Sequence, residues 1–334
     1  MKQLSTFDAG HEDLIHDVVY DYYGTKLITV SSDQRIKVWQ VEDTGAWSLN
    51  DVWKAHDSSI VKASWAHPEF GQVFASCSFD KTVKIWEEQE QEQCQSGRRW
   101  TECATLTESR GSVHDIEFAP NHLGLKLAAC GSDGVLRIYE AMDVVNLTSW
   151  TLMEEIEIVS GGSKESDGLY CVSWCQSRME SQMLVVGCGR DHTAKVYRVD
   201  YHGKWQPYEV LPGHGDTLCD IAWAPTMGRS YHLIATACKD GHVRIFKLTD
   251  ETNRSGVVGL HDTSMQKHFR VDLIADFDNN GAEAWRVEWN VTGTILSSSS
   301  DDGNVRLWKA SYLDDWKLIS TICAEQFEPT SETK

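Results

Sequence analysis

The sequence predicts an all-β protein, a propeller of six four-stranded blades in one continuous domain. Six times along its 334 residues an Asp stands six positions before a large aromatic residue. The intervening residues are typical of a strand, and successive Asp residues are 47 to 62 positions apart. Because one such repeat cannot bury its own apolar face, neighbouring repeats must stack on each other. The six pairs are Asp33/Trp39, Asp80/Trp86, Asp133/Tyr139, Asp191/Tyr197, Asp240/Phe246 and Asp302/Trp308.

Each repeat divides into four short strands. In the second repeat, residues 60–65, 73–77 and 82–86 are rich in β-branched and aromatic residues and are separated by polar turns. A fourth strand follows and opens on Trp in every repeat except the fifth, where we expect it over residues 269–274. The first strand of each repeat ends in an aromatic residue: Tyr20, Trp65, Phe118, Trp174, Trp223 and Trp289. The predicted domain covers residues 7–324, with blades at about 10–54, 55–107, 108–157, 165–212, 213–276 and 280–324, and a polar tail over 325–334.

Three repeats add a His before the first strand and a hydroxyl residue four positions before the Asp. This is the WD-repeat pattern, in which His, hydroxyl, Asp and aromatic form a buried polar network within one blade. A His–hydroxyl–Asp set could also suggest a hydrolase, but catalysis needs one set in a cleft beside an oxyanion site. Since the set recurs along the chain, we assign it a structural role. The residues so assigned are His11, Thr29, Asp33 and Trp39; His56, Ser76, Asp80 and Trp86; and His214, Thr236, Asp240 and Phe246.

Composition narrows the function classes further. A net charge of −19 argues against direct nucleic-acid binding, which needs a basic surface. The ten Cys form neither a disulfide framework nor a zinc-ligand pattern, and no phosphate-binding or dinucleotide-binding motif occurs. We therefore expect no catalytic residue, metal or cofactor. No secretory leader or membrane-spanning stretch is evident, which favours cytosol or nucleus, and we interpret the acidic run over 87–93 as a solvated loop.

The residues alone do not decide whether the ring of blades is closed. WD propellers usually share their last blade between the two ends of the chain. Here the first and sixth blades each have a fourth strand of their own, opening at Trp47 and Trp316. Two arrangements fit this pattern: a closed ring held by packing alone, and an open ring that exposes its first and last blades to strand addition by another chain.

Longer stretches carry a family resemblance. Residues 16–24, 65–71 and 223–231 look like the Sec-thirteen family. Residues 118–128, followed by 134–141 and 150–152, together with 285–294, are more specific. They resemble the Sec-thirteen-homologue nucleoporins of fungal type, and the likeness extends over nearly the entire chain.

The resemblance implies an open six-bladed propeller into which an α-solenoid nucleoporin inserts a blade. It also implies membership of the Y-shaped subcomplex of the nuclear pore, with other Y-complex nucleoporins as partners. A second location is implied at the vacuolar membrane, with the SEA/GATOR subunits that regulate the TOR kinase. An inserted blade would pack on the first strands of blades one and six, and residues 3–8 would add an outer strand to it. The predicted interface residues are Phe7, Val18, Tyr20, Trp285, Val287 and Trp289.

Two alternatives remain at this point. One is a vesicle-coat propeller of the Sec-thirteen type, and the other is a generic WD-repeat peptide receptor, which needs an Arg-rich cluster on one face. Four Arg do recur in third strands, but we expect them to point outward as ordinary strand-face residues; they are Arg35, Arg137, Arg244 and Arg306. Blades three, four and six lack the leading His, so we expect them to be held more by packing and less by the polar network.

Overall fold

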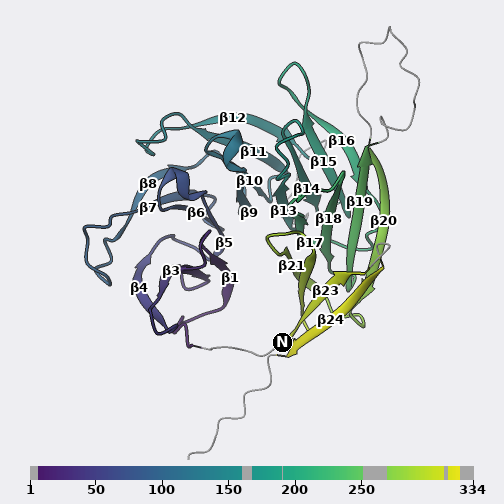
Figure 1. Cartoon of the computed structure of the whole chain (residues 1–334). Helices are drawn as coiled ribbons and strands as arrows, with labels where there is room; N and C mark the ends of the chain where they lie inside the picture. Colours follow the sequence, from purple (N-terminus) through teal and green to yellow (C-terminus); the bar gives the residue numbers. More distant parts are fainter. Residues whose placement is uncertain (1–6, 160–167, 190, 251–268, 312–314, 324–334) are drawn as a thin grey trace, which may run out of the picture. The chain divides into compact units, whose positions relative to one another are not determined.

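The computed structural model describes residues 7–159, 168–189, 191–250, 269–311 and 315–323. They form six four-stranded antiparallel sheets in which every strand pairs with its neighbour in sequence (Figure 1). Within the described chain, helix is limited to two short 3-10 turns, η1 (Pro68–Phe70) and η2 (Asn121–Leu123). The predicted fold class is confirmed: the protein is a six-bladed WD-repeat β-propeller.

The strands follow the predicted order blade by blade. The first three blades are β1 (Ile15–Tyr20), β2 (Lys26–Ser31), β3 (Arg35–Val41) and β4 (Trp47–Lys54); β5 (Ile60–Trp65), β6 (Val73–Ser78), β7 (Val83–Glu88) and β8 (Trp100–Leu106); and β9 (Val113–Phe118), β10 (Lys126–Gly131), β11 (Val135–Ala141) and β12 (Trp150–Glu157). The last three are β13 (Tyr170–Trp174), β14 (Met183–Cys188), β15 (Thr193–Val199) and β16 (Trp205–Leu211); β17 (Leu218–Trp223), β18 (Tyr231–Cys238), β19 (His242–Asp250) and β20 (Phe269–Asp278); and β21 (Ala284–Trp289), β22 (Ile295–Ser300), β23 (Asn304–Ala310) and β24 (Trp316–Cys323). Strand β20 is four residues longer than the 269–274 predicted for it.

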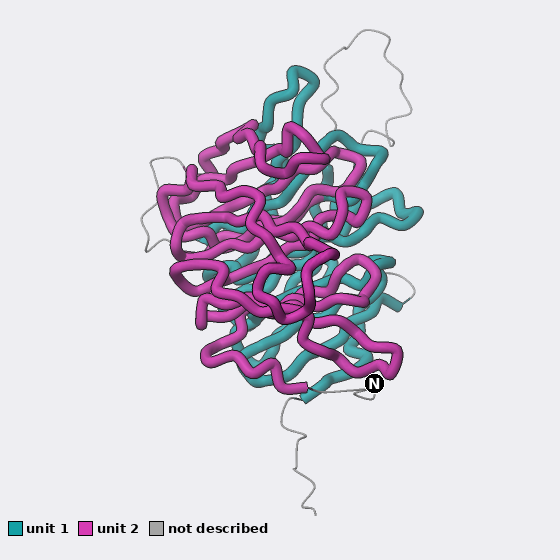
Figure 2. Tube along the Cα trace, turned by 90° about the vertical axis from the view of Figure 1, so that its left-hand side faces the viewer, with its two compact units in different colours: residues 1, 175–334 teal, residues 2–174 magenta. Residues whose placement is uncertain are grey.

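The chain falls into two compact units. Unit 2 covers residues 2–174 and unit 1 covers residue 1 with 175–334 (Figure 2). Among the described residues, no helix combines the length and the apolar character needed to cross a bilayer.

Unit 2 is held by apolar layers between consecutive blades. Ile28 and Val38 of blade one are fully buried against Phe74 and Trp86 of blade two. On its other face, blade two packs through Val73 and its neighbours against blade three. Since a buried Leu, Ile or Phe side chain contributes about 1.5–3 kcal/mol, these layers are the main source of stability in this unit.

Unit 1 repeats this construction between blades five and six. Leu233, Ala235 and Ile245 of blade five pack against Val287 and Trp289 of blade six in one buried cluster. The ring of Phe277 stacks on Trp308 at 3.8 Å between ring centroids, so the residues by which β20 exceeds its predicted length take part in the contact.

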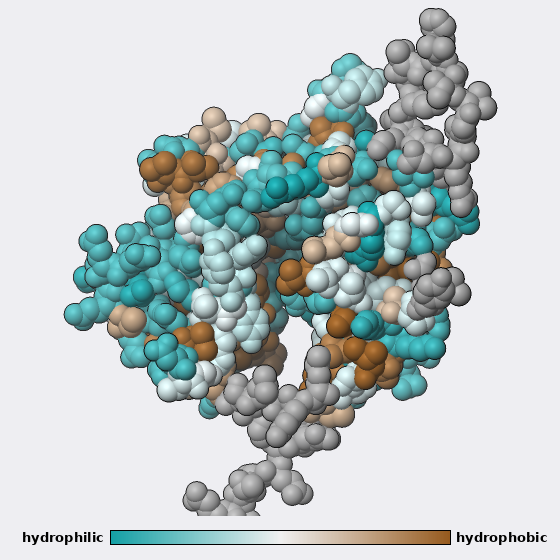
Figure 3. Space-filling view, in the orientation of Figure 1, coloured by the Kyte–Doolittle hydropathy of each residue, from teal (hydrophilic) through white to brown (hydrophobic). Residues whose placement is uncertain are grey.

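The polar loop between β7 and β8 is anchored to blade one rather than merely solvated. Its surface is strongly hydrophilic in the space-filling view (Figure 3), as its composition predicts. The main chain of Gln95 nevertheless donates to Asn50 of β4 at 2.7 Å, and the buried Asp51 accepts from the main-chain N–H groups of Gly97 and Arg99 at 2.8 and 3.1 Å. The interpretation of 87–93 as a solvated loop therefore holds for the exposed residues 90–93, but not for the base of the loop, where Glu88 is buried.

Glu88 forms the base of the same loop and is buried. Its carboxylate pairs with Lys26 of β2 and, at 2.9 Å, with Arg99. The Lys26 ammonium also lies 5.7 Å from the ring centroid of Trp100. One carboxylate thus joins a strand of blade one to both ends of the β7–β8 loop.

Candidate functional site

The His–hydroxyl–Asp–Trp sets of blades one and two are assembled as hydrogen-bonded chains. In blade two, His56 joins Asp80 at 2.9 Å and Ser76 at 2.8 Å, and the Trp86 indole donates to the Ser76 hydroxyl at 2.9 Å. Blade one has the same order, with 2.8 Å from His11 to both Asp33 and Thr29 and 3.1 Å from Trp39 to Thr29. Each chain connects the turn before the first strand to the second and third strands, which fixes their register.

Both Asp carboxylates are held in the charged form. Burial alone would raise the pKa of Asp80, but hydrogen bonds from His56 and Thr82 lower it below the ordinary value. At Asp33, burial likewise acts to raise the pKa, but the hydrogen bonds from His11 and from main-chain donors lower it. These carboxylates act as permanent acceptors at neutral pH, which is a structural role.

The third set is only partly connected. His214 reaches Thr236 at 3.0 Å, but its second ring nitrogen has no partner among the described residues. The ring of Phe246 carries no N–H group that could donate to Thr236, unlike the indole of Trp. Asp240 is instead paired with Arg244 at 2.9 Å. Burial and the nearby Arg244 charge lower the pKa of His214 to about 4, so this imidazole is neutral under physiological conditions.

In blades three and six an Arg, in place of a His, pairs with the Asp of the repeat. Arg137 is buried and pairs with Asp133 at 2.7 Å, and Arg306 is buried and pairs with Asp302. The Trp308 indole also donates to Ser298 at 2.9 Å. The expectation that these Arg point outward is wrong for Arg137, Arg244 and Arg306; only Arg35 is exposed. Blades three and six are therefore held by ion pairs as well as by packing.

A second set of polar residues joins one blade to the next, and our sequence interpretation missed it. In the odd-numbered blades an Asp of the first strand accepts the main-chain N–H of a first-strand residue in the following blade. The pairs are Asp17 to Ala63 at 3.0 Å, Asp115 to Val172 at 2.8 Å and Asp220 to Val287 at 3.0 Å. The signal was present, because each Asp stands three residues before the strand-end aromatic in blades one, three and five.

The same junctions carry a reciprocal bond. The strand-end Trp of the even-numbered blade donates its indole N–H to a main-chain carbonyl of the odd-numbered blade before it. These bonds run from Trp65 to Val19 at 3.3 Å, from Trp174 to Glu117 at 3.0 Å and from Trp289 to Ala222 at 3.1 Å. Blades are thus tied in odd–even pairs by two bonds of opposite direction.

Glu117 adds a titratable group to one of these junctions. Its carboxylate accepts the main-chain N–H of Trp174 at 3.0 Å. Burial and the negative charge of Asp115 raise the pKa of Glu117 to about 8, although Lys62 and Ser173 act in the opposite direction. Glu117 therefore keeps its proton to a higher pH than an ordinary Glu does.

This raised pKa predicts that stability falls as the pH increases. An unfolded Glu has a pKa of about 4.3, so between that value and about 8 the folded state holds a proton that the unfolded state has lost. We expect the melting temperature to decrease from about pH 6 to about pH 8.5 and the decrease to be smaller in Glu117→Gln. The exposed Glu157→Gln serves as the control and should keep the wild-type slope. Equal slopes for Glu117→Gln and the wild type in thermal melts would contradict the assignment.

Blade one presents an uncovered face. Val18 and Tyr20 of β1 are 50% and 56% exposed. The corresponding residues of blade three, Ile116 and Phe118, are 1% and 6% exposed because blade two packs over them. Phe7 lies on the same side of blade one as Tyr20, since its ring centroid is 4.8 Å from that of Trp39 and 6.3 Å from that of Trp47, which Tyr20 also contacts. Of the predicted strand over residues 3–8, positions 3–6 lie outside the described residues.

Of the predicted interface residues in blade six, two are buried and one is partly exposed. Val287 and Trp289 are buried against blade five, so they present no free face for a partner and are removed from the predicted set. Trp285 is 41% exposed, and its indole donates to Asp301 at 3.0 Å. Strand alternation explains the division, because the sequence does not reveal which alternate residues of β21 face blade five.

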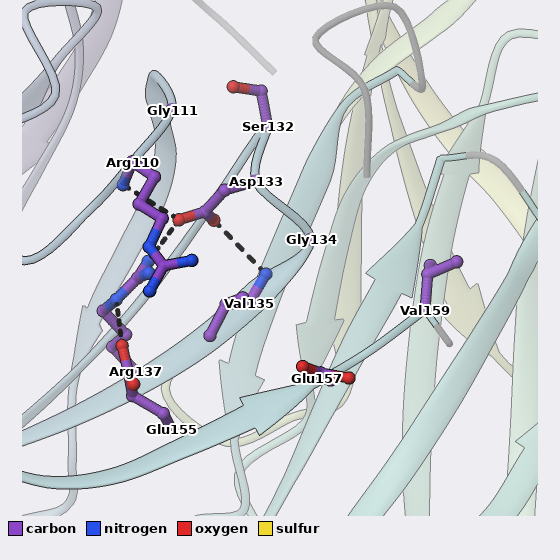
Figure 4. A pocket seen from close by; sticks show the side chains of 10 residues that line it. All are labelled: Arg110, Gly111, Ser132, Asp133, Gly134, Val135, Arg137, Glu155, Glu157 and Val159. Atoms are coloured by element: carbon purple, nitrogen blue, oxygen red, sulfur yellow. Dashed lines mark hydrogen bonds and ion pairs between the residues drawn. The ribbon is translucent and has the colours of Figure 1, made fainter. Parts of the chain in front are cut away.

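A cavity of about 430 Å³ opens beside blade three (Figure 4). Asp133 lies in its wall, paired with Arg137 and accepting the main-chain N–H of Arg110 at 3.1 Å, while Glu155 pairs with Arg137 at 3.0 Å. The lining includes neither His nor Cys, and across the described part of the chain no cluster of His, Cys, Asp and Glu suits a metal ion. The cavity is thus lined by the structural ion pair of blade three.

Comparison of the sequence with known proteins identifies the family of this chain. The family model "WD domain, G-beta repeat" matches residues 1–40, 47–87, 205–247 and 273–309. The chain is 46% identical to nucleoporin SEH1 of Saccharomyces cerevisiae, over 97% of this chain and all of the relative. It is also 46% identical to nucleoporin seh1 of Schizosaccharomyces pombe, covering 96% and 97% of the two chains, and 44% identical to human nucleoporin SEH1, covering 94% and 86%. On these similarities the chain belongs to the nucleoporin SEH1 family of WD-repeat propellers.

Proposed function

We propose that this chain is a non-catalytic scaffold subunit of the nuclear pore complex, located at the nuclear envelope. Its relatives are named as nucleoporins and resemble it over nearly their whole length, which supports this role. The His–hydroxyl–Asp sets recur in blades one and two and join strands to one another, which supports a structural role and the absence of an enzyme function.

Within the pore, we propose that the chain accepts an inserted blade from an α-solenoid nucleoporin of the Y subcomplex, and through it joins the other Y-complex nucleoporins. One observation carries this proposal: Val18 and Tyr20 are exposed at positions that a neighbouring blade buries in blade three. Apolar side chains on an uncovered sheet face are typical of a protein–protein contact. The family resemblance supports the same partner, and extends the proposal to the SEA/GATOR subunits at the vacuolar membrane.

The test is co-purification of the tagged chain from its own cells, with identification of the partners. We expect the Y-complex solenoid nucleoporin with the wild type and its loss with Val18→Glu, because a carboxylate would have to be buried at the contact. Val145→Glu is the matched control, since Val145 is 87% exposed in a loop of blade three and should not affect capture.

The outcomes separate the candidate functions. Vesicle-coat subunits in place of pore subunits would favour the vesicle-coat alternative. Pore subunits without SEA/GATOR subunits would limit the role to the nuclear envelope. Retention of the solenoid nucleoporin by Val18→Glu would contradict insertion beside blade one.

A further inference from the structure

The first strand of each blade is an edge strand whose outward N–H groups need acceptors. In β1, Asp21 donates to Lys26 across the sheet, so by antiparallel alternation the N–H groups of Val18 and Tyr20 point away from β2. The same alternation in β9, where Ala119 donates to Lys126, turns the Phe118 N–H outward. These outward groups are where consecutive blades meet.

In blades two, three, four and six the strand-end aromatic is held to the preceding blade through an N–H group. Trp65 and Trp289 use the indole N–H, as described above. Phe118 has no indole, and its main-chain N–H donates instead to the Ser64 hydroxyl of blade two at 3.2 Å. Trp174 uses both, with its main-chain N–H on the Glu117 carboxylate at 3.0 Å. In both main-chain cases the acceptor residue stands one position before the strand-end aromatic of its own blade.

Tyr20 is the strand-end aromatic of blade one and resembles Phe118 in lacking an indole. Its main-chain N–H points outward, and in the described part of the chain no side-chain oxygen accepts it. The neighbouring Val18 N–H is satisfied by its own Asp17 at 2.9 Å, and Asp17 also holds Ala63 of blade two. Tyr20 is therefore the position where blade one lacks the bond that a preceding blade supplies.

We propose that the β-sheet docking on blade one presents a side-chain oxygen, from Ser, Thr, Asp or Glu, to the Tyr20 main-chain N–H. This inference rests on the proposed function and specifies the chemistry of the partner strand. The oxygen stands one residue before an aromatic that packs near Tyr20, as Ser64 stands before Trp65 beside Phe118. Apolar side chains of the same strand cover Val18 and Tyr20, as blade two covers Ile116 and Phe118.

The occupant is a strand of another protein rather than a loop or a small molecule. Ile116 and Phe118 are covered by a complete four-stranded blade, and Val18 and Tyr20 occupy the equivalent positions in the first strand of another four-stranded blade. An extended strand also carries acceptor and apolar side chains at the alternating spacing that these positions require.

The experiment compares Tyr20→Val with Tyr20→Pro in binding to the purified α-solenoid nucleoporin. Both variants lose the aromatic ring, but only Pro removes the N–H, and Pro is tolerated on an edge strand where that group faces away from the sheet. A hydrogen bond contributes about 0.5–1.5 kcal/mol, so we expect Tyr20→Pro to bind about 2- to 12-fold more weakly than Tyr20→Val. Thermal melts of the two free variants should agree closely, which excludes a folding defect as the cause.

A second measurement removes the acceptor from the partner. Replacing the predicted Ser, Thr, Asp or Glu of the inserted strand by Ala should weaken binding to Tyr20→Val and leave binding to Tyr20→Pro unchanged, because the bond is already absent there. Equal affinities of Tyr20→Val and Tyr20→Pro would overturn the inference while leaving the proposed function intact. Absence of solenoid binding to the wild type would overturn the proposed function itself. A dimer of this chain that Val18→Glu dissociates would identify a second copy as the occupant and also overturn the inference.

Discussion

Asp80→Ala should destabilise the protein by about 2–4 kcal/mol, because it removes the acceptor that three donors share, among them the buried His56. Asp80 accepts from His56 at 2.9 Å, from the Asp57 main chain at 3.1 Å and from the Thr82 hydroxyl at 2.6 Å. His56 is 2% exposed, so it has little contact with water once the acceptor is lost. The measurement is urea unfolding of the purified variant, followed by far-UV circular dichroism.

Asp191→Ala is the matched control for this prediction. Asp191 has the same position in the fourth repeat but is exposed, and it is paired with Lys195 at 3.4 Å. Since exposed ion pairs contribute about 0–1 kcal/mol, we expect little change in its unfolding midpoint. Similar losses in the two variants would show that the turn itself, rather than the His56–Ser76–Trp86 chain, accounts for the effect.

Glu88→Ala should have a comparable effect, a loss of about 2–4 kcal/mol, since it leaves two cations partly buried without their shared carboxylate. Lys26 and Arg99 keep only 13% and 16% of their side-chain surface exposed. Without the carboxylate that joins Lys26 to Arg99, the β7–β8 loop should also bind less firmly to Asp51 of blade one. We expect hydrogen exchange to increase in β4 and in residues 95–99, in addition to the lower unfolding free energy.

Glu90→Ala tests whether position rather than charge decides this result. Glu90 lies two residues away in the same acidic run and is exposed, so its removal should change stability by less than about 0.5 kcal/mol. Deletion of residues 88–95, which a solvated loop would tolerate, should instead destabilise blade one because it removes Glu88 and Gln95 together. A deletion variant as stable as the wild type would restore the interpretation as a free loop.

The sequence predicted the repeat architecture well because the spacing of Asp and aromatic residues reflects the blade itself. Each Asp–aromatic pair spans one turn and the third strand, so the positions of Asp80 and Trp86 determine both. The assembled chains in blades one and two follow from the same spacing, since antiparallel pairing places Ser76 opposite Lys84 and close to Trp86.

Side-chain direction was harder to predict. Arg137 and Arg306 stand four residues after their Asp, a spacing as typical of outward strand residues as of ion pairs, and only the strand register decides between them. Val287 and Val18 each stand two residues before a strand-end aromatic, yet Val287 is buried and Val18 is exposed. The difference depends on which neighbouring blade packs on each face, which is a property of the assembled sheets and not of either strand.

The odd–even bonds also bear on how the chain acquires its structure during synthesis. The acceptor Asp17 meets its donor Ala63 46 residues later, and Asp115 meets Val172 57 residues later. A nascent chain that has emerged from the ribosome only to the end of an odd-numbered blade would expose that carboxylate and an apolar face together. Emergence of the next blade covers both. Protection of ribosome-bound chains from protease should therefore increase in steps of two blades, with the largest gain at each even-numbered blade.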